Sequence, residues 1–364
     1  MTNAIPVAPE YVQRIARYIP GKPIEELARE LHLDPATIVK LASNENPRGP
    51  SPKVLAAIAA AAADVTRYPD GYGYLLKDAL AARLGVDQAQ LVLGNGSNDI
   101  LELATQAFLR PGEAAVYSQH AFAVYPLATQ ARGARGIEVP VRDLGHDLPA
   151  MRAAITADTR IVFVANPNNP TGTFLAADAL EAFIDSVPRN VLIVLDEAYR
   201  ELVTDPEVAD GLETYGDRPN ILVLRTMSKA WGLAGLRMGY LVAQPEVAAA
   251  IRKVLTPFST SLVAQAAAIA ALAQEPEVRR RCALVVSERD RVTEALRAMG
   301  ADVPTSQANF VWLPLGDGAV PFGQVCESRG IIVRPFQGDG VRVTIGTAEE
   351  NDAFLAAAEV ALKS

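Results

Sequence analysis

The sequence predicts an α/β fold, with a mostly parallel central sheet that carries helices on both faces, plus a smaller α+β domain. The first observation is that short, continuous apolar runs alternate with helix-like segments through the middle of the chain. Strands that are covered on both faces have this pattern. The second is the length of 364 residues, which exceeds the size at which a single hydrophobic core stops growing.

The strands of the large domain are expected where the apolar runs lie. These are AAVYS at 114–118, RIVFVAN at 160–166, VLIVLDEAY at 191–199, ILVLRTMSK at 221–229 and MGYLVAQ at 238–244. A helix is expected between two of them, over LAADALEAFIDSV at 175–187. In open α/β sheets ligands bind beyond the carboxyl ends of the strands, so the polar residues that end these runs are candidates for a site.

The pattern changes after residue 261. A long helical stretch is expected from Leu262 to Met299, interrupted near Pro276, and is followed by the strand-like runs ANFVWLPL, GIIVRPF and VRVTIGT. Thr347 and Glu350 have the spacing of a capping box, which predicts the start of the last helix. The expected division is an irregular N-terminal arm over 1–45 that joins the small domain, a large domain over 46–260 that carries these candidate site residues, and a linking helix with the small domain over 261–364.

Composition and charge exclude several classes of protein. There are 34 basic and 42 acidic residues, a net charge of −8, which argues against general binding to nucleic acid or to anionic membranes. The two cysteines cannot build a disulfide framework, and no secretory leader opens the chain, so a cytoplasmic location is expected. The longest apolar stretch is too short to span a bilayer, and the three histidines lack metal-ligand spacing, so no metal site is expected.

Two loops after predicted strands offer polar groups to a ligand. LVLGNGSNDILEL at 91–103 has a strand, a glycine turn and a helix start, where backbone N–H groups can bind an anion. Asp99 could cap that helix instead, and the alternative is a plain turn. VANPNNPTG at 164–172 is a rigid loop whose asparagines either face a ligand or form turn hydrogen bonds.

A carboxylate, a phenol, a lysine and an arginine follow the next strands. Asp196 ends a buried strand, where an ionised carboxylate requires a cationic partner, either an arginine or a protonated ligand nitrogen. Tyr199 comes three residues later, and Lys229 and Arg237 follow the next strand. A lone strand-end lysine is ordinarily a solvated surface residue. A phosphorylated heteroaromatic cofactor with a carbonyl group explains the whole set.

These motifs, NPNNPTG, DEAY and SKAWGLAGLRMGY in this order, resemble those of the fold-type-I aminotransferases that depend on pyridoxal 5′-phosphate. The resemblance covers nearly the whole chain. Within that group YIPGKPIEEL, VKLASNENPRGPSP, RYPD and VRVTIGTAEEN are most similar to the histidinol-phosphate aminotransferases. The resemblance therefore implies a transaminase that moves an amino group from L-histidinol phosphate to 2-oxoglutarate, reversibly, in histidine biosynthesis.

The resemblance also implies roles for residues around the cofactor. Lys229 would be linked covalently to it and would move a proton during the reaction, which requires an amine that is neutral near pH 7. Asp196 would pair with the ring nitrogen, Tyr199 and Asn169 would donate to the ring oxygen, and Phe122 would stack on the ring. The phosphate would be held by Ser97, Asn98, Thr226, Ser228 and Arg237.

Three further residues concern the substrates and the partner subunit. Tyr68 in RYPD resembles a residue that reaches into the site of the partner, which implies a homodimer with composite active sites. Arg334 and Arg342 are the candidates for the substrate end, where they would meet the phosphate of one substrate and the carboxylates of the other. The alternatives are an aromatic amino-acid aminotransferase, a decarboxylase of a phosphorylated amino acid and, from a different class, a dinucleotide-binding oxidoreductase.

Overall fold

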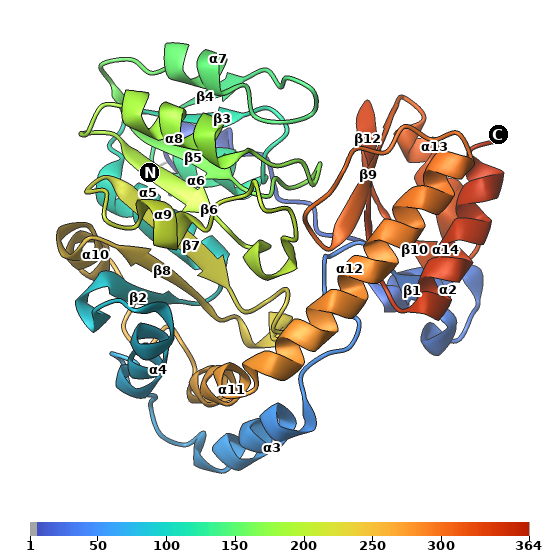
Figure 1. Ribbon diagram of the computed structural model, residues 1–364, viewed down its shortest axis with the longest axis horizontal. Coiled ribbons are helices and arrows are strands. Elements are labelled where there is room, and N and C mark those ends of the chain that lie inside the picture. Colours follow the sequence, from blue (N-terminus) through green and yellow to red (C-terminus); the bar gives the residue numbers. More distant parts are fainter. Residues whose placement is uncertain (1–5, 364) are drawn as a thin grey trace, which may run out of the picture.

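The computed structural model describes residues 6–363 and shows two parts, each built on a β-sheet (Figure 1). The large part contains a seven-stranded sheet with the order β2-β8-β7-β6-β5-β3-β4. Its strands are β2 (Leu91–Gly94), β3 (Ala114–Ser118), β4 (Arg135–Val139), β5 (Thr159–Ala165), β6 (Leu192–Asp196), β7 (Ile221–Thr226) and β8 (Gly239–Ala243). β8 runs antiparallel to β7 and to β2, and the remaining neighbours are parallel, so the prediction of a mostly parallel sheet is confirmed.

The five apolar runs form β3, β5, β6, β7 and β8, and the strand expected at the start of LVLGNGSNDILEL forms β2, so one strand of the seven was not expected. The unexpected strand is β4, which lies at the edge of the sheet beyond β3. Most of its residues are exposed or half-buried. A strand of this kind lacks the continuous apolar run that identified the buried strands, because only one of its faces and one of its edges are covered.

Alternate side chains of the strands enter two separate hydrophobic clusters, one on each face of the sheet. On β5, Val162 and Val164 belong to the first cluster, whereas Ile161 and Phe163 belong to the second. This alternation follows from the two-residue repeat of a strand. The helices of the large part are α3 (Pro52–Ala61), α4 (Tyr74–Leu84), α5 (Ser97–Phe108), α6 (Val124–Gln130), α7 (Leu148–Ala153), α8 (Ala177–Ser186), α9 (Gly211–Tyr215) and α10 (Pro245–Arg252).

Helices cover both faces of the sheet, as the sequence predicted. Helices α5, α6 and α10 supply the second cluster, and α4, α7, α8 and α9 supply the first. The expected helix over 175–187 is α8. The long helical stretch is two helices, α11 (Leu262–Leu272) and α12 (Glu275–Ala298), and Pro276 lies in the first turn of α12, where its missing N–H costs nothing.

The small part contains a three-stranded antiparallel sheet with the order β11-β12-β9. Its strands are β9 (Phe310–Gly316), β11 (Arg334–Phe336) and β12 (Asp339–Thr344), and its helices are α13 (Ala319–Glu327) and α14 (Ala348–Ala361). Thr347 and Glu350 form the predicted capping box at the start of α14. Figure 1 shows α12 running from the large part to the small part.

The N-terminal segment begins on the large part, where Tyr11 lies beside Pro111 and Gly133, then packs against the small part and returns to the large part. It contains α1 (Glu10–Gln13), α2 (Ile24–Leu31) and β1 (Val39–Lys40), so it is less irregular than its prolines predicted. β1 pairs in parallel with β10 (Ile331–Ile332) of the small part. The following residues, 41–46, run along the opening between the two parts and reach the residues described below.

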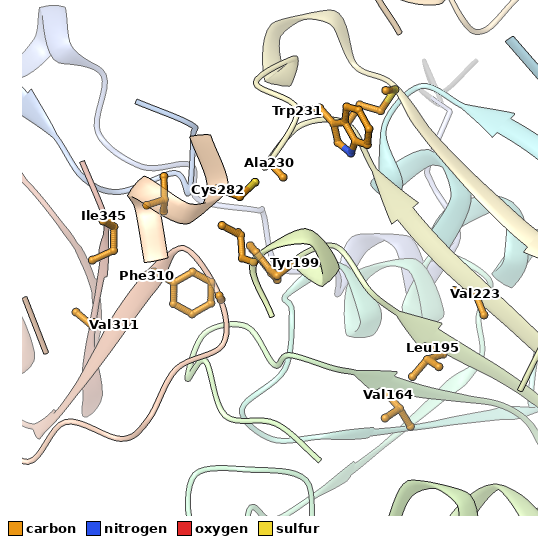
Figure 2. Close-up of a cluster of buried hydrophobic side chains, with 14 of the residues drawn as sticks. Val164, Leu195, Tyr199, Val223, Ala230, Trp231, Cys282, Phe310, Val311 and Ile345 are labelled. Carbon is orange, nitrogen blue, oxygen red and sulfur yellow. The ribbon is translucent and has the colours of Figure 1, made fainter. Parts of the chain in front are cut away.

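The hydrophobic core is continuous between the two parts. The first cluster contains residues of both sheets, and Figure 2 shows Tyr199 and Phe310 together, between Leu195 of the large sheet and Val311 of the small one. The rings of Tyr199 and Phe310 meet edge to face, with their centroids 5.2 Å apart. Cys282 and Cys326 are free and buried. Over residues 6–363, no helix has the length and apolar character needed to cross a membrane.

Candidate active site

A cavity lies where the carboxyl ends of the large-sheet strands face the N-terminal segment and the small sheet. It has an empty volume of about 900 Å³, part of which is open to solvent. It is lined by eleven of the residues that the sequence singled out: Ser97, Asn98, Phe122, Asn169, Asp196, Tyr199, Ser228, Lys229, Arg237, Arg334 and Arg342. The structure therefore brings the strand-end residues together with the two arginines of the small part.

The charges on the cavity wall are unbalanced. Four cationic side chains line it, Lys229, Arg237, Arg334 and Arg342, against the single carboxylate of Asp196. Within the described part of the chain, the ion pairs involve none of these five side chains. Unpaired cations in an enclosed space favour anionic ligands, so the cavity is suited to a ligand set that carries several negative charges.

Asp196 is held at the end of β6 with only 6% of its surface exposed. Its Oδ2 accepts a hydrogen bond from the Tyr125 hydroxyl at 2.8 Å, and its Oδ1 accepts from the Ala198 N–H at 3.1 Å. Burial raises the pKa of Asp196 to about 6, against the opposing effect of these hydrogen bonds and of Lys229. A protonated ring nitrogen placed here would favour the ionised carboxylate.

Lys229 follows β7 and extends its amine into the cavity. Its Nζ donates to the backbone carbonyl of Ser43 at 3.1 Å. Enclosure lowers the pKa of Lys229 to about 8, and the nearby charges of Arg342 and Arg237 act in the same direction. Part of the population is therefore neutral near pH 7, which is the form that attacks a carbonyl or accepts a proton.

One end of the cavity is formed by the N-terminus of α5 and by Arg237. No side chain caps α5, and Asp99 turns back to accept from the N–H of Asn95 at 2.8 Å, so the amides of the first turn stay available to an anion. Arg237 packs on the turn before the helix, where a Cβ added to Gly96 would lie 2.3 Å from its Nη2. This end of the cavity combines backbone amides with a guanidinium, which suits a phosphate.

The opposite end is formed by the two arginines of the small part. Arg342 Nη1 donates to Asn169 Oδ1 at 2.6 Å, and its Nη2 donates to the carbonyl of Ala42 at 2.7 Å. Its guanidinium lies 5.5 Å from the ring centroid of Phe310. Arg334 Nη2 donates to the carbonyl of Ile19 at 2.6 Å. Among residues 6–363, both guanidinium groups bind neutral oxygens only, so they remain able to pair with an anion.

Tyr199 and Phe122 lie between these two ends. The Tyr199 Oη accepts a hydrogen bond from Asn44 Nδ2 at 2.9 Å, and burial raises the pKa of this phenol to about 12, so it stays neutral at physiological pH. The ring of Phe122 meets Tyr125 edge to face at 5.9 Å. Asn168 donates to the His120 carbonyl and to Thr171, so its amide forms hydrogen bonds that hold the loop.

Two predicted residues do not line the cavity. Thr226 is buried beneath it, where its hydroxyl oxygen accepts from the N–H of Ser228 at 3.2 Å. Thr226 therefore supports the loop that carries Ser228 and Lys229. Tyr68 lies outside the cavity, is 82% exposed, and stacks on Phe258 with ring centroids 4.8 Å apart.

Three cavity residues were missed by the sequence analysis. Tyr125 bonds Asp196, Asn44 bonds Tyr199, and Tyr18 lines the cavity from the N-terminal segment. Tyr125 lies in α6 among apolar residues, where nothing in the sequence distinguishes it from a core aromatic. Asn44 and Tyr18 lie within the motifs SNENP and YIPGKP, which carried part of the family resemblance. Their membership of these motifs could have identified them as site residues.

Comparisons with known proteins agree with this geometry. The chain is 52% identical over 361 residues to histidinol-phosphate aminotransferase 2 of Pseudomonas aeruginosa, and the alignment covers 98% of each chain. It is 53% identical over 319 residues to the aromatic amino acid aminotransferase of Thermobifida fusca, with 88% of this chain and 89% of that protein covered.

The fold is also found among solved structures. The structure of histidinol-phosphate aminotransferase from Sinorhizobium meliloti, in complex with pyridoxal-5′-phosphate, matches with a TM-score of 0.90 and 30% identity, covering 100% of this chain and 99% of that one. The predicted fold-type-I architecture is thereby confirmed. The sequence also matches the family described as aminotransferase class I and II over residues 36–357. Since this match covers most of its length, the chain belongs to the class I and II aminotransferase family.

Proposed function

We propose that the protein transfers an amino group from L-histidinol phosphate to 2-oxoglutarate, giving imidazole-acetol phosphate and glutamate, in histidine biosynthesis. The observation that carries the proposal is the distribution of cations in the cavity, one anion site beside α5 and a second at Arg334 and Arg342. A cofactor with one phosphate and a substrate with another would together fill both sites. Relatives named histidinol-phosphate aminotransferase, such as that of Pseudomonas aeruginosa, support the substrate assignment.

The cofactor is pyridoxal 5′-phosphate, and the residues present fit it. The uncapped start of α5 and the close approach of Arg237 to Gly96 form a cradle for its phosphate, together with Ser97, Asn98 and Ser228. Thr226 would act from beneath by holding the Ser228 loop. When bound, this cofactor supplies an aldehyde that links to amines and a pyridinium ring that accepts electron density from the substrate carbon.

The residues around the ring would control protons and orientation. Lys229 Nζ would hold the cofactor covalently and, once the substrate amine has replaced it, would take the proton from the substrate carbon. Its lowered pKa suits this role because a neutral amine is needed. Asp196 would keep the ring nitrogen protonated, Asn169 and Tyr199 would donate to the ring oxygen, and Phe122 would cover one face of the ring.

Arg334 and Arg342 would bind the far end of each substrate. A planar guanidinium fits a phosphate and a carboxylate equally well, so the same pair can receive histidinol phosphate and then 2-oxoglutarate. Each substrate anion would replace a neutral oxygen partner of one of these arginines, Ile19 for Arg334 and Ala42 for Arg342. The exchange gains a charge-assisted hydrogen bond in place of a weaker one.

An aromatic amino-acid aminotransferase is the second candidate, favoured by the relative from Thermobifida fusca. The substrate end also contains two phenylalanines beside Arg342, Phe310 at 5.5 Å and Phe336 at 6.0 Å. An amino acid would present its carboxylate to Arg342 and would leave Arg334 without an anionic partner. The two candidates therefore differ in the importance of Arg334.

A homodimer with composite sites completes the proposal. The stretch between α3 and α4 exposes apolar side chains, with Val65 63% and Tyr72 82% exposed, beside the Tyr68–Phe258 stack. Grouped exposed apolar residues of this kind mark a surface that binds another protein. Tyr68 would reach from this surface into the partner's cavity. The two free, buried cysteines suit the reducing cytoplasm, where we place the enzyme.

The test is kcat/KM for histidinol phosphate, histidinol and phenylalanine, measured with the wild type, Arg334→Ala and Arg342→Ala. Each truncation should lower the value for histidinol phosphate by about 30- to 1000-fold, the effect of about 2–4 kcal/mol. Histidinol, which has no phosphate, should be a poor substrate and lose little more. The control is Arg329→Ala, which removes an exposed arginine of the same part that does not line the cavity. A preference for phenylalanine with Arg334 dispensable would establish the aromatic aminotransferase instead.

A further inference from the structure

Asn44 occupies an unusual backbone position next to the cavity. Its φ is +55° and only 1% of its surface is exposed. Residues other than glycine rarely adopt such a φ, and asparagine is among those that tolerate it best. Glycine would fit the backbone equally well but has no side chain. The contacts of the Asn44 amide therefore show what the side chain contributes.

The hydrogen bonds of Asn44 have a fixed direction. Its backbone N–H can only donate, and it donates to Thr344 Oγ1 at 2.9 Å. The Thr344 hydroxyl must then use its own hydrogen elsewhere, and it donates to Asn44 Oδ1 at 2.9 Å. This bond identifies the other end of the amide as Nδ2, which donates to Tyr199 Oη at 2.9 Å. The Asn44 backbone N–H, which can only donate, thus fixes the direction of the hydrogen bonds from Asn44 through Thr344 to Tyr199.

The consequence for Tyr199 is that its oxygen already accepts one hydrogen bond. A phenol that accepts from one side keeps its own hydrogen for a different acceptor. Tyr199 is 4% exposed and lines the cavity, so the remaining direction for that hydrogen is into the cavity. The charged and titratable groups that face this phenol are Arg342, Asp196 and Tyr18.

We propose that Asn44 is a positioning residue: its amide, oriented by Thr344, turns the hydroxyl hydrogen of Tyr199 into the cavity, toward the ring oxygen of the cofactor. The inference rests on the proposed function, because it assigns a direction to the Tyr199 contact with the bound cofactor. Without the amide, the phenol can rotate its hydrogen toward other acceptors, and the ring oxygen loses a donor for part of the time.

Asn44 also lies next to residues that contact two cations of the site. Ala42 accepts from Arg342, and Ser43 accepts from Lys229. Thr344 follows Arg342 by two residues on β12. A small displacement of β12 would therefore reach Tyr199 through a single amide.

The experiment measures the pH midpoint of the visible absorbance of the protein loaded with pyridoxal phosphate. A donor to the ring oxygen lowers this midpoint because it stabilises negative charge on that oxygen. The variants are Asn44→Gly, which keeps the backbone conformation and removes the amide, Tyr199→Phe, and the double variant. Thr344→Val removes the hydroxyl that orients the amide, and Thr344→Ser is the matched control because it retains that hydroxyl.

Asn44→Gly should raise the midpoint by about one pH unit, the size of one neutral hydrogen bond. In the Tyr199→Phe background, Asn44→Gly should add no further shift, because it acts through the phenol. Thr344→Val should raise the midpoint in the same direction, and Thr344→Ser should leave it at the wild-type value. A general loosening of the structure would instead shift the midpoint additively and would not spare Thr344→Ser.

Two results would overturn the inference. One is an unchanged midpoint in Asn44→Gly while Tyr199→Phe shifts it, and the other is full additivity in the double variant. If Asn44→Gly does not fold, as judged by circular dichroism and thermal melting, the Thr344→Val and Thr344→Ser pair decides the question alone. A wild-type protein that shows no hydroxylamine-sensitive visible absorbance would contradict the proposed function itself, which is a different outcome from unshifted variants.

Discussion

Replacing Asp196 by asparagine should have opposite effects on the stability of the cofactor-free protein and on activity. Burial raises the pKa of Asp196 from 3.8 to about 6, so the folded state favours the protonated acid more than the unfolded state does. A carboxyl group whose pKa is higher in the folded state than in the unfolded state stabilises the fold when it is protonated. This stabilisation is fully present below the unfolded pKa. That contribution is lost as the pH rises through the folded pKa of about 6.

The magnitude follows from the size of the pKa change. A shift of roughly two units corresponds to about 3 kcal/mol, which the ionised carboxylate costs the folded protein above pH 7. Asparagine removes this cost but cannot accept from both the Tyr125 hydroxyl and the Ala198 N–H, which costs about 1–2 kcal/mol. At pH 8 and without cofactor, Asp196→Asn should therefore be more stable than the wild type by about 1–2 kcal/mol, or about 1–3 °C in Tm.

The assay is thermal unfolding of both proteins, without cofactor, at several pH values between 4 and 8. The difference between the two melting temperatures isolates Asp196, because the other titrating groups are common to both. The advantage of the variant should be present at pH 8 and should disappear as the pH falls below about 6. A wild type that is the more stable protein at pH 8, or a difference independent of pH, would refute the reasoning. Turnover of the loaded variant should fall by roughly 2–4 orders of magnitude.

Further predictions concern Lys229 and Gly96. Lys229→Ala should abolish transamination yet still bind pyridoxal phosphate non-covalently, and borohydride reduction of the wild type followed by peptide mapping should label Lys229. In the cofactor-free protein, reductive methylation of Lys229 should increase with a midpoint near pH 8. Gly96→Ala should displace Arg237 and thereby weaken cofactor binding, measured by equilibrium dialysis, by about 10- to 100-fold. The control is Gly85→Ala, which should leave binding unchanged. Gly85 also has a positive φ, but no atom lies within 4 Å of the added Cβ.

The cofactor end of the site could be predicted from the sequence because its residues follow strands directly. Asp196, Tyr199 and Lys229 come at or just after the ends of apolar runs, and parallel strands bring such ends to one edge of the sheet. The strands themselves were predicted from their continuous apolar runs, which identify strands that are covered on both faces. β4 escaped because an exposed edge strand has no continuous apolar run.

The residues that support the site could not be predicted in this way because their partners are distant in the sequence. Tyr125 and Asp196 are 71 residues apart, Asn44 and Tyr199 are 155 apart, and Arg342 and Ala42 are 300 apart. No periodic pattern encodes such pairs, since they depend on how the N-terminal segment and the small sheet pack on the large part. Sequence similarity identified the chemistry, but only the coordinates show which neutral side chains fix its direction.

The cofactor-free cavity holds its charged groups in unfavourable states. Burial raises the pKa of Asp196 and lowers the pKa of Lys229 and of Arg342. Among the described residues, the hydrogen-bond partners of Arg342 are neutral. All three shifts have burial as their first cause, because enclosure removes solvent and disfavours the charged form of each group. The excess of positive charge on the wall adds to the shifts of Lys229 and Arg342 and opposes that of Asp196. A phosphate and a protonated ring nitrogen would supply the missing opposite charges. Cofactor binding should therefore stabilise the wild type more than Asp196→Asn at pH 8, reversing their order of stability, because only the wild type gains the pair between carboxylate and ring nitrogen.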